Sequence, residues 1–498
     1  MVADPVFSAC SWIGNTGTVA DPYDHTDIAD CITDASGKTG DVTISIPSCD
    51  VTWDAPVEVN MESGFANVTS ITVSGAGTPP TTCDNATAAG FSIPSACGSA
   101  VSGGTKITMS GAGFRMTGAA GKKWRITNLF LSGSAATNYS IITALGTSKP
   151  SDGGGWRVDH VTSRDITSKF IHSSYVGNTS GVVHNIDNRK SGQFSNWAHL
   201  THGGNTLWSN DPIQQDMIFI EDSFFEDTTP TVPSMLADGS YGASIVVRYN
   251  AIKGYYVGGH DASSDARGIR RYEVYGNEFY NAGSNGAIHS AFALRGGDGY
   301  IYENKMTFPG SNPFSACTVL QGGHGICLAN YRSLAGIDWS LWPAEQFRSY
   351  CDSSEEYMCV GSYWSNSVCD PESASACNNV QVDCQAVDNA TASNGYPCRD
   401  QIGRGTNQKS SPMLFWGNTA SINGGDYEYA EATVRQDDNV TLHVVAGRDF
   451  CTAESVMPAT CNGVTTIYTP YAYPHPLRGS ATNLLRGRVT GNLSGSVK

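Results

Sequence analysis

Positively charged and titratable side chains gather between residues 248 and 295. Five arginines fall in this stretch, although only 15% of the 498 residues are charged and the net charge is −16. Arginine guanidiniums neutralise a substrate carboxylate, which acidifies the neighbouring C–H group, and a base such as His can then remove that proton. The stretch therefore predicts a site for an acidic polymer, with these candidates: Arg248, His260, Asp261, Asp265, Arg267, Arg270, Arg271, Glu273, His289 and Arg295.

Within this set we assign His260 as the proton acceptor and Arg270 or Arg271 as the group that holds the substrate carboxylate. The remaining catalytic candidates are Arg267 and Glu273, and the substrate-binding candidates are Arg248 and Arg295. A purely structural role is the alternative. In that case the arginines pair with carboxylates of neighbouring repeats or stack on nearby tyrosines.

A second candidate cluster lies in the run Cys-Arg-Asp-Gln-Ile-Gly-Arg-Gly at residues 398–405. Asp400 and Arg404 are its substrate-binding candidates, because the glycines predict a tight loop that presents them. The alternative is that both residues only lock this segment onto the rest of the fold. On an earlier repeat, Asp159 and His160 are adjacent on a strand and must face opposite ways unless the strand bends there.

The elements that must position these residues follow a repeat. Strand-like segments begin at residues 218, 245, 272 and 299, which are 27 residues apart each time. Asn250, Asn277 and Asn304 keep the same spacing. A unit of this length cannot bury its apolar side without stacked neighbours, so the period predicts a solenoid.

The recurrent Asn predicts a turn in each repeat, since Asn tolerates the left-handed backbone conformation, and its amide can bond to the next Asn in a ladder. Parallel crossovers are almost always right-handed, so we expect an all-β right-handed parallel β-helix. A β-sandwich is the alternative, but the Asn-Gly hairpin turns that it needs are scarce. Side chains on adjacent repeats would lie about 4.8 Å apart and could form a continuous groove.

The chain divides into four predicted parts. Residues 1–60 hold an N-terminal capping helix, from Asp27 to Ser36 with Ile28, Cys31 and Ile32 on one side, and the first coil. Residues 61–332 form the coils, and 333–412 form a disulfide-rich excursion packed on them. Residues 413–498 hold the last coils and a proline-rich tail that cannot be a central strand.

Fifteen cysteines without zinc-type or haem-type spacing favour disulfides and an oxidising, extracellular or cell-surface location. Their odd number leaves at least one thiol free or paired with another chain, which would allow self-association. Seven glycosylation sequons fit surface loops of a glycoprotein. The negative net charge argues against nucleic acid as a partner. The sequence has no apolar stretch of 18 residues, so no transmembrane helix is predicted.

Several segments resemble the secreted right-handed parallel β-helix proteins of the pectate-lyase-like superfamily. These are the helix with Gly40–Pro47 and Trp53, the element Ile71–Gly77, and the strands Trp156–His160, Arg248–Asn250, Arg271–Tyr275 and Arg295–Gly297. The segments 395–405 and 468–477 resemble a bacterial subgroup of unassigned chemistry. The resemblance implies the fold, but members of the superfamily carry out many reactions or none.

Together these features predict a secreted polysaccharide-active protein, most simply a lyase, or a hydrolase, acting on an acidic glycan. The motif Gly323-His324-Gly325 lacks the accompanying carboxylates of an inverting hydrolase, so the sequence favours a hydrolase less than a lyase. We expect no cofactor, with calcium as the open possibility. The alternative is a non-catalytic cell-surface, filament, sheath or tailspike-like β-helix with an adhesive or structural role.

Overall fold

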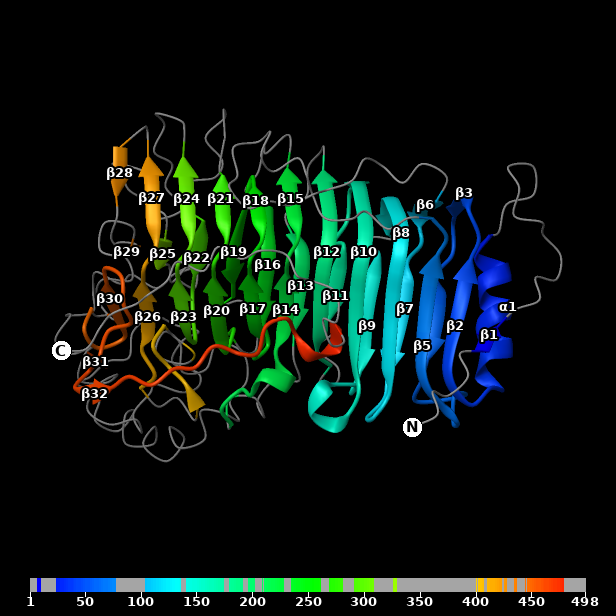
Figure 1. Ribbon diagram of the computed structural model, residues 1–498, viewed down its shortest axis with the longest axis horizontal. Coiled ribbons are helices and arrows are strands. Elements are labelled where there is room, and N and C mark those ends of the chain that lie inside the picture. The colour runs from blue at the N-terminus through cyan, green and yellow to red at the C-terminus, as the bar shows by residue number, and fades with distance from the viewer. Residues whose placement is uncertain are drawn as a thin grey trace, which may run out of the picture.

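The computed structural model describes residues 7–9, 24–77, 104–135, 140–173, 179–190, 196–201, 208, 210–227, 234–260, 268–280, 291–308, 326–328, 400, 402–406, 410–422, 425–427, 434–436, 444 and 446–478. This part of the chain is all-β, with long parallel sheets and one α-helix (Figure 1). The strands stack side by side along one long axis. The arrangement is compatible with the predicted β-helix.

The larger sheet has twenty strands and two branches. The first branch begins with β1 (Phe7–Ala9) and continues with β2 (Gly40–Ile46), β5 (Val68–Gly75), β8 (Lys123–Ala135), β10 (Gly155–Ile166), β12 (Gly181–Lys190), β14 (Ile218–Glu221), β17 (Ser244–Arg248), β20 (Arg271–Tyr275), β23 (Asp298–Tyr302), β26 (Met413–Trp416) and β30 (Phe450–Ala453). The second holds β3 (Cys49–Trp53), β6 (Thr105–Gly111), the ends of the long strands β8, β10 and β12, then β15 (Phe224–Asp227), β18 (Ala251–Lys253), β21 (Glu278–Tyr280), β24 (Lys305–Phe308), β27 (Thr419–Ile422) and β28 (Gly425–Tyr427).

The smaller sheet has ten parallel strands. They are β4 (Val57–Asn60), β7 (Phe114–Gly118), β9 (Ile142–Gly146), β11 (Ile171–Ser173), β13 (Asn196–Thr201), β16 (Ser234–Ser240), β19 (Tyr255–Gly259), β22 (Phe292–Leu294), β25 (Ile326–Leu328) and β29 (Val434–Gln436). Short 3-10 turns lie at Pro150–Asp152, Gln214–Asp216 and Pro476–Arg478. Among the described strands only β27–β28 and the hairpin of β31 (Thr460–Cys461) with β32 (Val464–Thr465) pair antiparallel, beside an isolated antiparallel bridge between Arg404 and Ser410. This predominance of parallel pairing excludes the β-sandwich alternative.

The predicted 27-residue repeat is confirmed by strand register. Strand β17 pairs with β20, and β20 with β23, so that Val247 lies opposite Val274 and Val274 opposite Ile301. These strands are buried on both faces. Alternate residues such as Ile245 and Val247 join the main core, whereas the intervening Val246 belongs to a second buried cluster. The inward side chains join one continuous apolar core, in which Trp124 and Trp156 stack with ring centroids 5.5 Å apart.

The predicted asparagine ladder is confirmed and extends by one member. Asn250, Asn277, Asn304 and Asn418 are all buried, and each Nδ2 donates to the Oδ1 of the next at 3.0 Å. Each amide also donates to a backbone carbonyl, such as Val247 O for Asn277 at 2.9 Å. The ladder thus joins neighbouring repeats where the two branches of the larger sheet meet.

The left-handed residue at this corner differs from the prediction. It is the residue before the ladder asparagine: Tyr249, Gly276, Glu303 and Gly417 have φ between 52° and 64°. The asparagine itself must keep its amide pointing along the stack, so the preceding residue makes the bend. In earlier repeats the left-handed residues at this corner are Asn128, His160, Asn185 and Asp222.

Helix α1 (His25–Ser36) lies at one end of the stack and packs against β1, β2 and β4 (Figure 1). Asp24 and Asp27 form a capping box at its start, which satisfies free backbone N–H groups. Ile28, Cys31 and Ile32 are buried, as predicted. Cys31 is disulfide-bonded.

The segment 329–412 separates the consecutive strands β25 and β26. The predicted cysteine-rich excursion, residues 333–412, lies outside the described residues except for 400, 402–406 and 410–412. Despite this insertion, β26 pairs with β23 and Asn418 continues the ladder from Asn304, 114 residues earlier. The insertion therefore leaves the stacking of the repeats intact.

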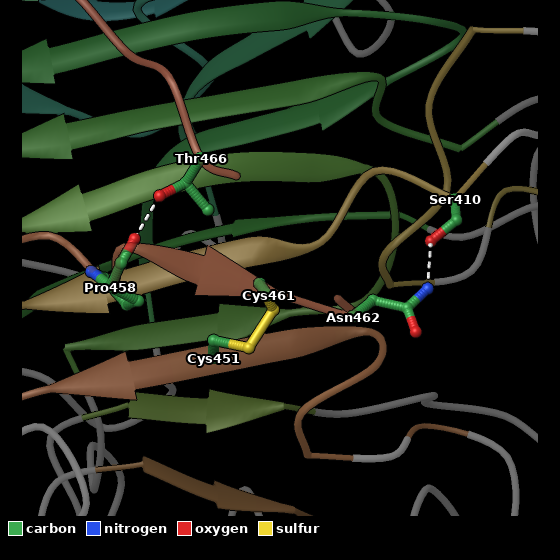
Figure 2. Close-up of a disulfide and its surroundings, with 6 residues drawn as sticks. All are labelled: Ser410, Cys451, Pro458, Cys461, Asn462 and Thr466. Carbon is green, nitrogen blue, oxygen red and sulfur yellow. Dashed lines mark hydrogen bonds between the residues drawn. A yellow bond between two sulfur atoms is a disulfide. The ribbon is translucent and has the colours of Figure 1, made fainter. Parts of the chain in front are cut away.

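One disulfide lies close to the start of the C-terminal tail. Cys451 of β30 bonds to Cys461 of β31, and Asn462 Nδ2 donates to Ser410 Oγ at 3.2 Å (Figure 2). Thr466 Oγ1 donates to Pro458 O. These contacts fix the hairpin from which the tail departs. Among the described cysteines, Cys49 carries a free thiol, and burial raises the pKa of that thiol to about 11.

Candidate functional site

A row of polar side chains lies on the outer face of the smaller sheet. His172 on β11, His199 on β13 and Asp238 on β16 occupy matching register positions of three adjacent strands. Their sequence neighbours Ile171, Ala198 and Ala237 point into the core and are fully buried. Because side chains alternate along a strand, the three polar groups face outward together. We call this set, with Lys169, Ser240, His260 and Arg295, the histidine row.

The first half of the histidine row is a fixed pair of imidazoles. The rings of His172 and His199 stack with centroids 4.9 Å apart and an angle of 8° between them. Lys169 Nζ lies 3.0 Å from His199 Nδ1 and can only donate, so that nitrogen accepts. The proton of neutral His199 is therefore on Nε2, which donates to Ser240 Oγ at 3.1 Å.

Both imidazoles stay neutral over a wide pH range. Burial lowers the pKa of His172 to about 4, and the nearby Lys169 charge acts in the same direction. Burial also lowers the pKa of His199 to about 3, with Asp238 opposing the shift and Lys169 adding to it. At neutral pH these two groups contribute hydrogen bonds and shape, not charge.

The second half of the row is a histidine–carboxylate pair. His260 Nε2 lies 3.1 Å from Asp238 Oδ1 and 3.2 Å from Oδ2, and the imidazole side chain is 24% exposed, whereas that of Asp238 is 2% exposed. Burial raises the pKa of Asp238, but the hydrogen bond from His260 and nearby positive charge, including that of Arg295, outweigh it, so the pKa falls below its usual value. Asp238 is therefore ionised and accepts the Nε2 proton of His260.

This arrangement is suited to proton abstraction. With Nε2–H bound to Asp238, the second nitrogen of the neutral imidazole, Nδ1, has a lone pair that can take a proton. The carboxylate stabilises the imidazolium that forms, as orienting carboxylates do in acid–base pairs. Lys169 and Arg295 add positive charge to the same row, which otherwise has only Asp238 as a charged group.

The structure divides the predicted cluster of residues 248–295 between different parts of the molecule. His260 and Arg295 belong to the histidine row. Arg267 lies outside the described residues, as do Asp261, Asp265 and His289. The other four, Arg248, Arg270, Arg271 and Glu273, lie on or beside the larger sheet and do not join the row. One continuous groove made of all these residues is not formed.

Arg270 and Arg271 share one buried carboxylate. Arg271 bonds to both oxygens of Asp298 at 2.7 and 2.8 Å, and Arg270 Nη1 lies 2.8 Å from Oδ2. Burial raises the pKa of Asp298, but the two guanidiniums more than reverse the shift and hold it well below the usual range. Arg270 also contacts Asp211 at 3.1 Å and lies over the Trp208 ring. Their predicted role of holding a substrate carboxylate stays a prediction, but a carboxylate of the chain already fills that position.

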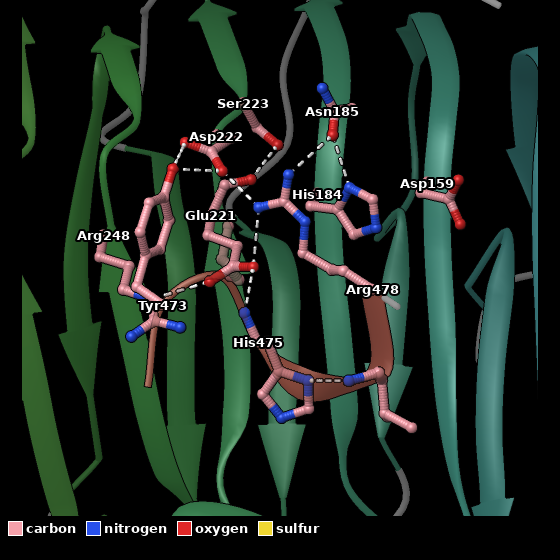
Figure 3. A network of polar contacts seen from close by, with 12 residues as sticks. Asp159, His184, Asn185, Glu221, Asp222, Ser223, Arg248, Tyr473, His475 and Arg478 are labelled. Atoms are coloured by element: carbon pink, nitrogen blue, oxygen red, sulfur yellow. Dashed lines mark hydrogen bonds and ion pairs between the residues drawn. The ribbon is translucent and has the colours of Figure 1, made fainter. Parts of the chain in front are cut away.

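Arg248 and Glu273 lie beneath the C-terminal tail. Arg248 is fully buried, with Nε 2.8 Å from Glu221 Oε2 and Nη1 2.8 Å from the Tyr275 hydroxyl. Figure 3 shows the Arg248–Glu221 pair with the tail residues that contact it. Tyr468 of the tail donates to Glu273 Oε2 at 2.9 Å. Access of a substrate to either residue would require the tail to leave.

Asp400 and Arg404 lie beside the turn that links the smaller sheet to the larger one. The Asp400 carboxylate accepts from Gly268 N at 2.9 Å, and its carbonyl accepts from Gly297 N at 3.2 Å. Gly403 N donates to Gly297 O at 2.9 Å. Both side chains are buried. These contacts fit the alternative in which the segment is locked onto the fold, and a substrate-binding role is untested.

The sequence reasoning missed His172, His199, Lys169, Ser240 and Asp238. Two of them carried a usable signal, because His172 and His199 are 27 residues apart and each directly follows an apolar residue of a short strand. Asp238 carried none, since 39 residues separate it from His199. The strand after Asp159 does bend, at the left-handed His160, and His160 Nδ1 donates to Asp159 Oδ2 at 2.5 Å.

In the described residues, His, Cys, Asp and Glu form no group of three or more that could hold a metal ion. The calcium alternative therefore gains no site there and stays untested. No described helix is long and apolar enough to cross a membrane.

The sequence matches no family model, no curated protein and no solved structure significantly. The likeness to the pectate-lyase-like superfamily thus depends on the short segments quoted above and on the parallel architecture of the sheets.

Proposed function

We propose that the protein is a right-handed parallel β-helix of the pectate-lyase-like kind, exported to an oxidising extracellular compartment, that cleaves an acidic polysaccharide as a lyase. The parallel register and the asparagine ladder support the fold, and the Cys451–Cys461 disulfide supports the compartment. The substrate is assigned by chemistry: a polymer of sugars that carry a carboxylate next to an acidic C–H group.

The His260–Asp238 pair is the observation that carries this proposal. A half-buried imidazole is held by an ionised, buried carboxylate at 3.1 Å and lies in one row with Lys169 and Arg295. These are the groups that elimination from a uronate requires, namely a base and cations for the substrate carboxylate. His260 keeps the role predicted from sequence. Arg295 and Lys169 replace Arg270 and Arg271 as the groups that hold the carboxylate, because they lie in the same row as His260, whereas Arg270 and Arg271 pair with Asp298 beside the larger sheet.

In the proposed reaction His260 Nδ1 takes the proton from the carbon next to the substrate carboxylate. The electron pair of that C–H bond forms a carbon–carbon double bond as the bond to the glycosidic oxygen breaks. The leaving oxygen takes a proton from water, and the His260 proton is later released to solvent. The charges of Arg295 and Lys169 stabilise the carboxylate while negative charge builds on it.

The test is incubation of the protein with a panel of uronate polymers, following the absorbance of the unsaturated product and new reducing ends. We expect His260→Ala to lower the rate at least 100-fold, which is the usual contribution of a general base, and Asp238→Asn to lower it about tenfold or more. His25→Ala is the matched control. His25 lies on helix α1, where it pairs with Asp54, so its replacement should leave the rate unchanged.

Absence of product from every polymer would overturn the lyase assignment and favour the non-catalytic surface, filament or adhesive role. Product formation that survives His260→Ala would place the reaction elsewhere on the molecule.

A further inference from the structure

The C-terminal tail, residues 466–478, crosses the outer face of the larger sheet. It leaves the hairpin of β31 and β32 and runs across the strands toward β12 and β10, as the red segment of Figure 1 shows. Apart from the short turn Pro476–Arg478, it has no regular secondary structure. Its path is fixed instead by side chains of the sheet that bind its backbone.

Charged side chains of the sheet bind the tail backbone at both ends of the crossing. Arg248 Nη1 donates to Tyr471 O at 3.0 Å, and its Nη2 donates to Ala472 O at 2.8 Å. Arg157 Nη1 donates to Leu477 O at 3.2 Å and Arg478 O at 3.1 Å. Such bonds recognise the extended backbone of the tail and do not depend on the identity of the tail side chains.

The peptide N–H groups of the tail are bound as well. Glu221 Oε1 accepts from His475 N at 3.1 Å, and the side chain of Glu221 is fully buried. A buried carboxylate is costly unless it is paired and hydrogen-bonded. Arg248 pairs with its other oxygen, so the peptide N–H and the Arg478 guanidinium complete the set at Oε1.

Aromatic contacts add selectivity for the side chains of the tail. Tyr468 stacks on Tyr300 with ring centroids 3.9 Å apart, and Tyr473 meets Tyr249 at 4.4 Å. His475 packs on Phe219 at 4.4 Å. Burial lowers the pKa of His475 to about 4, so the ring is neutral in this contact.

The last residue of the tail that the structure describes closes an ion cluster. Arg478 Nη1 bonds to Glu221 Oε1 at 2.9 Å and also to Asp222, and Nη2 reaches Asn185 (Figure 3). Tyr473 donates to both oxygens of Asp222, at 2.7 and 2.8 Å. Burial raises the pKa of Asp222, although Arg478 opposes the shift.

We propose that this face of the larger sheet is a peptide-binding site for a tyrosine- and proline-rich segment with an arginine after its prolines, and that it binds the tail of a second copy of the chain when its own tail is displaced. The inference is independent of the histidine row. Its basis is that every contact of the tail is of the kind a separate ligand would make. Prolines 470, 474 and 476 restrict the backbone of the segment, which lowers the entropy lost on binding.

The experiment uses the full chain with a protease site inserted between Thr466 and Ile467. Ile467 is 84% exposed, so the inserted sequence is accessible to the protease. After cleavage, gel filtration with mass spectrometry tests whether the segment that begins at Ile467 stays bound. Fluorescence anisotropy then measures binding of a labelled synthetic peptide of residues 467–478 to cleaved and uncleaved protein.

The proposal expects two results. The cut segment co-elutes with the protein or exchanges with the labelled peptide, and uncleaved protein binds the peptide at least about tenfold more weakly because its own tail fills the site. Asp222→Asn in the cleaved protein should weaken peptide binding at least about fivefold by removing the charge that Arg478 meets. Asp50→Asn, an exposed carboxylate paired with Lys106, is the matched control and should not change binding.

Three results would overturn the proposal. One is loss of the cut segment with no rebinding while circular dichroism remains native. The second is unfolding of the cleaved protein, which would make the tail part of the core. The third is equal affinity of the peptide for the cleaved parent and its Asp222→Asn variant.

Discussion

Buried carboxylates that each hold two arginines recur through the molecule. The carboxylates and their arginines are Asp159 with Arg125 and Arg157, Asp187 with Arg164 and Arg189, Asp298 with Arg270 and Arg271, and Glu221 with Arg248 and Arg478. A buried carboxylate needs such partners because desolvation disfavours its charge. The arginines that suggest substrate binding in the sequence therefore serve largely to hold carboxylates of the chain.

Part of this pairing is readable from sequence. Arg271 and Asp298 are 27 residues apart, as are Arg248 and Glu221, so each pair occupies equivalent places in adjacent repeats. The Arg125–Asp159 and Arg478–Glu221 pairs are 34 and 257 residues apart and follow no period. His260 could be named from sequence as a base, but its carboxylate could not, because a loop of irregular length precedes Asp238.

Glu273 is expected to make stability depend on pH. Burial raises its pKa from 4.5 to about 7, against the Tyr468 hydrogen bond and the charges of Arg271 and Arg248. Its folded pKa lies above its unfolded one, so its contribution is complete below pH 4.5 and is lost as pH rises to 7. At about 1.4 kcal/mol per pKa unit, the loss is about 3 kcal/mol.

We expect Glu273→Gln to remove this loss, so that the variant gains stability relative to the parent as pH rises from 5 to 8. Urea unfolding at both pH values measures the change, with the exposed Glu58→Gln as control. Parallel pH dependence of parent and Glu273→Gln would contradict the assignment.

At the scale of elements, the asparagine ladder and the left-handed corner act together. Each corner bends at one residue and then places an asparagine whose amide satisfies groups in two neighbouring repeats. The 27-residue period makes these strands and the ladder predictable. The smaller sheet does not keep this period, because loops of different lengths separate β11, β13, β16 and β19. The register of its strands after His199 therefore could not be predicted from the sequence.

Asn277→Ala is expected to destabilise the protein by about 2–4 kcal/mol. The change removes a donor to Val247 O and Tyr275 O and an acceptor for Asn250 N, and leaves these buried groups without their partner. Equilibrium unfolding in denaturant measures the effect. Asn67→Ala at an exposed position just before β5 is the control, and an equal loss in both variants would show that the ladder adds nothing specific.

At the scale of the whole molecule, the tail links strands that are distant along the stack. In a protein of stacked repeats each repeat contacts only its neighbours, so the free energy of unfolding otherwise depends on contacts between adjacent repeats. Contacts of Tyr468 with Trp416 and of Arg157 with Arg478 O connect β26 to β10 through one short segment. The prolines allowed an extended tail to be predicted, but nothing in its composition indicates which face it covers.

We expect Arg478→Ala to weaken this link. In the parent, hydrogen exchange should give the same opening free energy for the amides of β12, β17 and β23. In the variant the opening free energy of β12 should differ from that of β17 and β23, because β12 loses its contact with the tail that links it to the later strands. Lys106→Ala, which breaks only an exposed pair with Asp50, serves as control. Identical exchange patterns in the parent and Arg478→Ala would refute the link.

The length of the tail also limits how many strands it can cross. From β26 to β10 there are six steps between adjacent strands, or about 29 Å at 4.8 Å each. The ten residue steps from Tyr468 to Arg478 reach at most about 33 Å when fully extended, and the turn at Pro476–Arg478 shortens that reach. The span is therefore nearly taut, and duplication of one repeat between these strands would put the arginine anchor out of reach. Changes in the number of repeats in this interval must be matched by changes in the length of the tail.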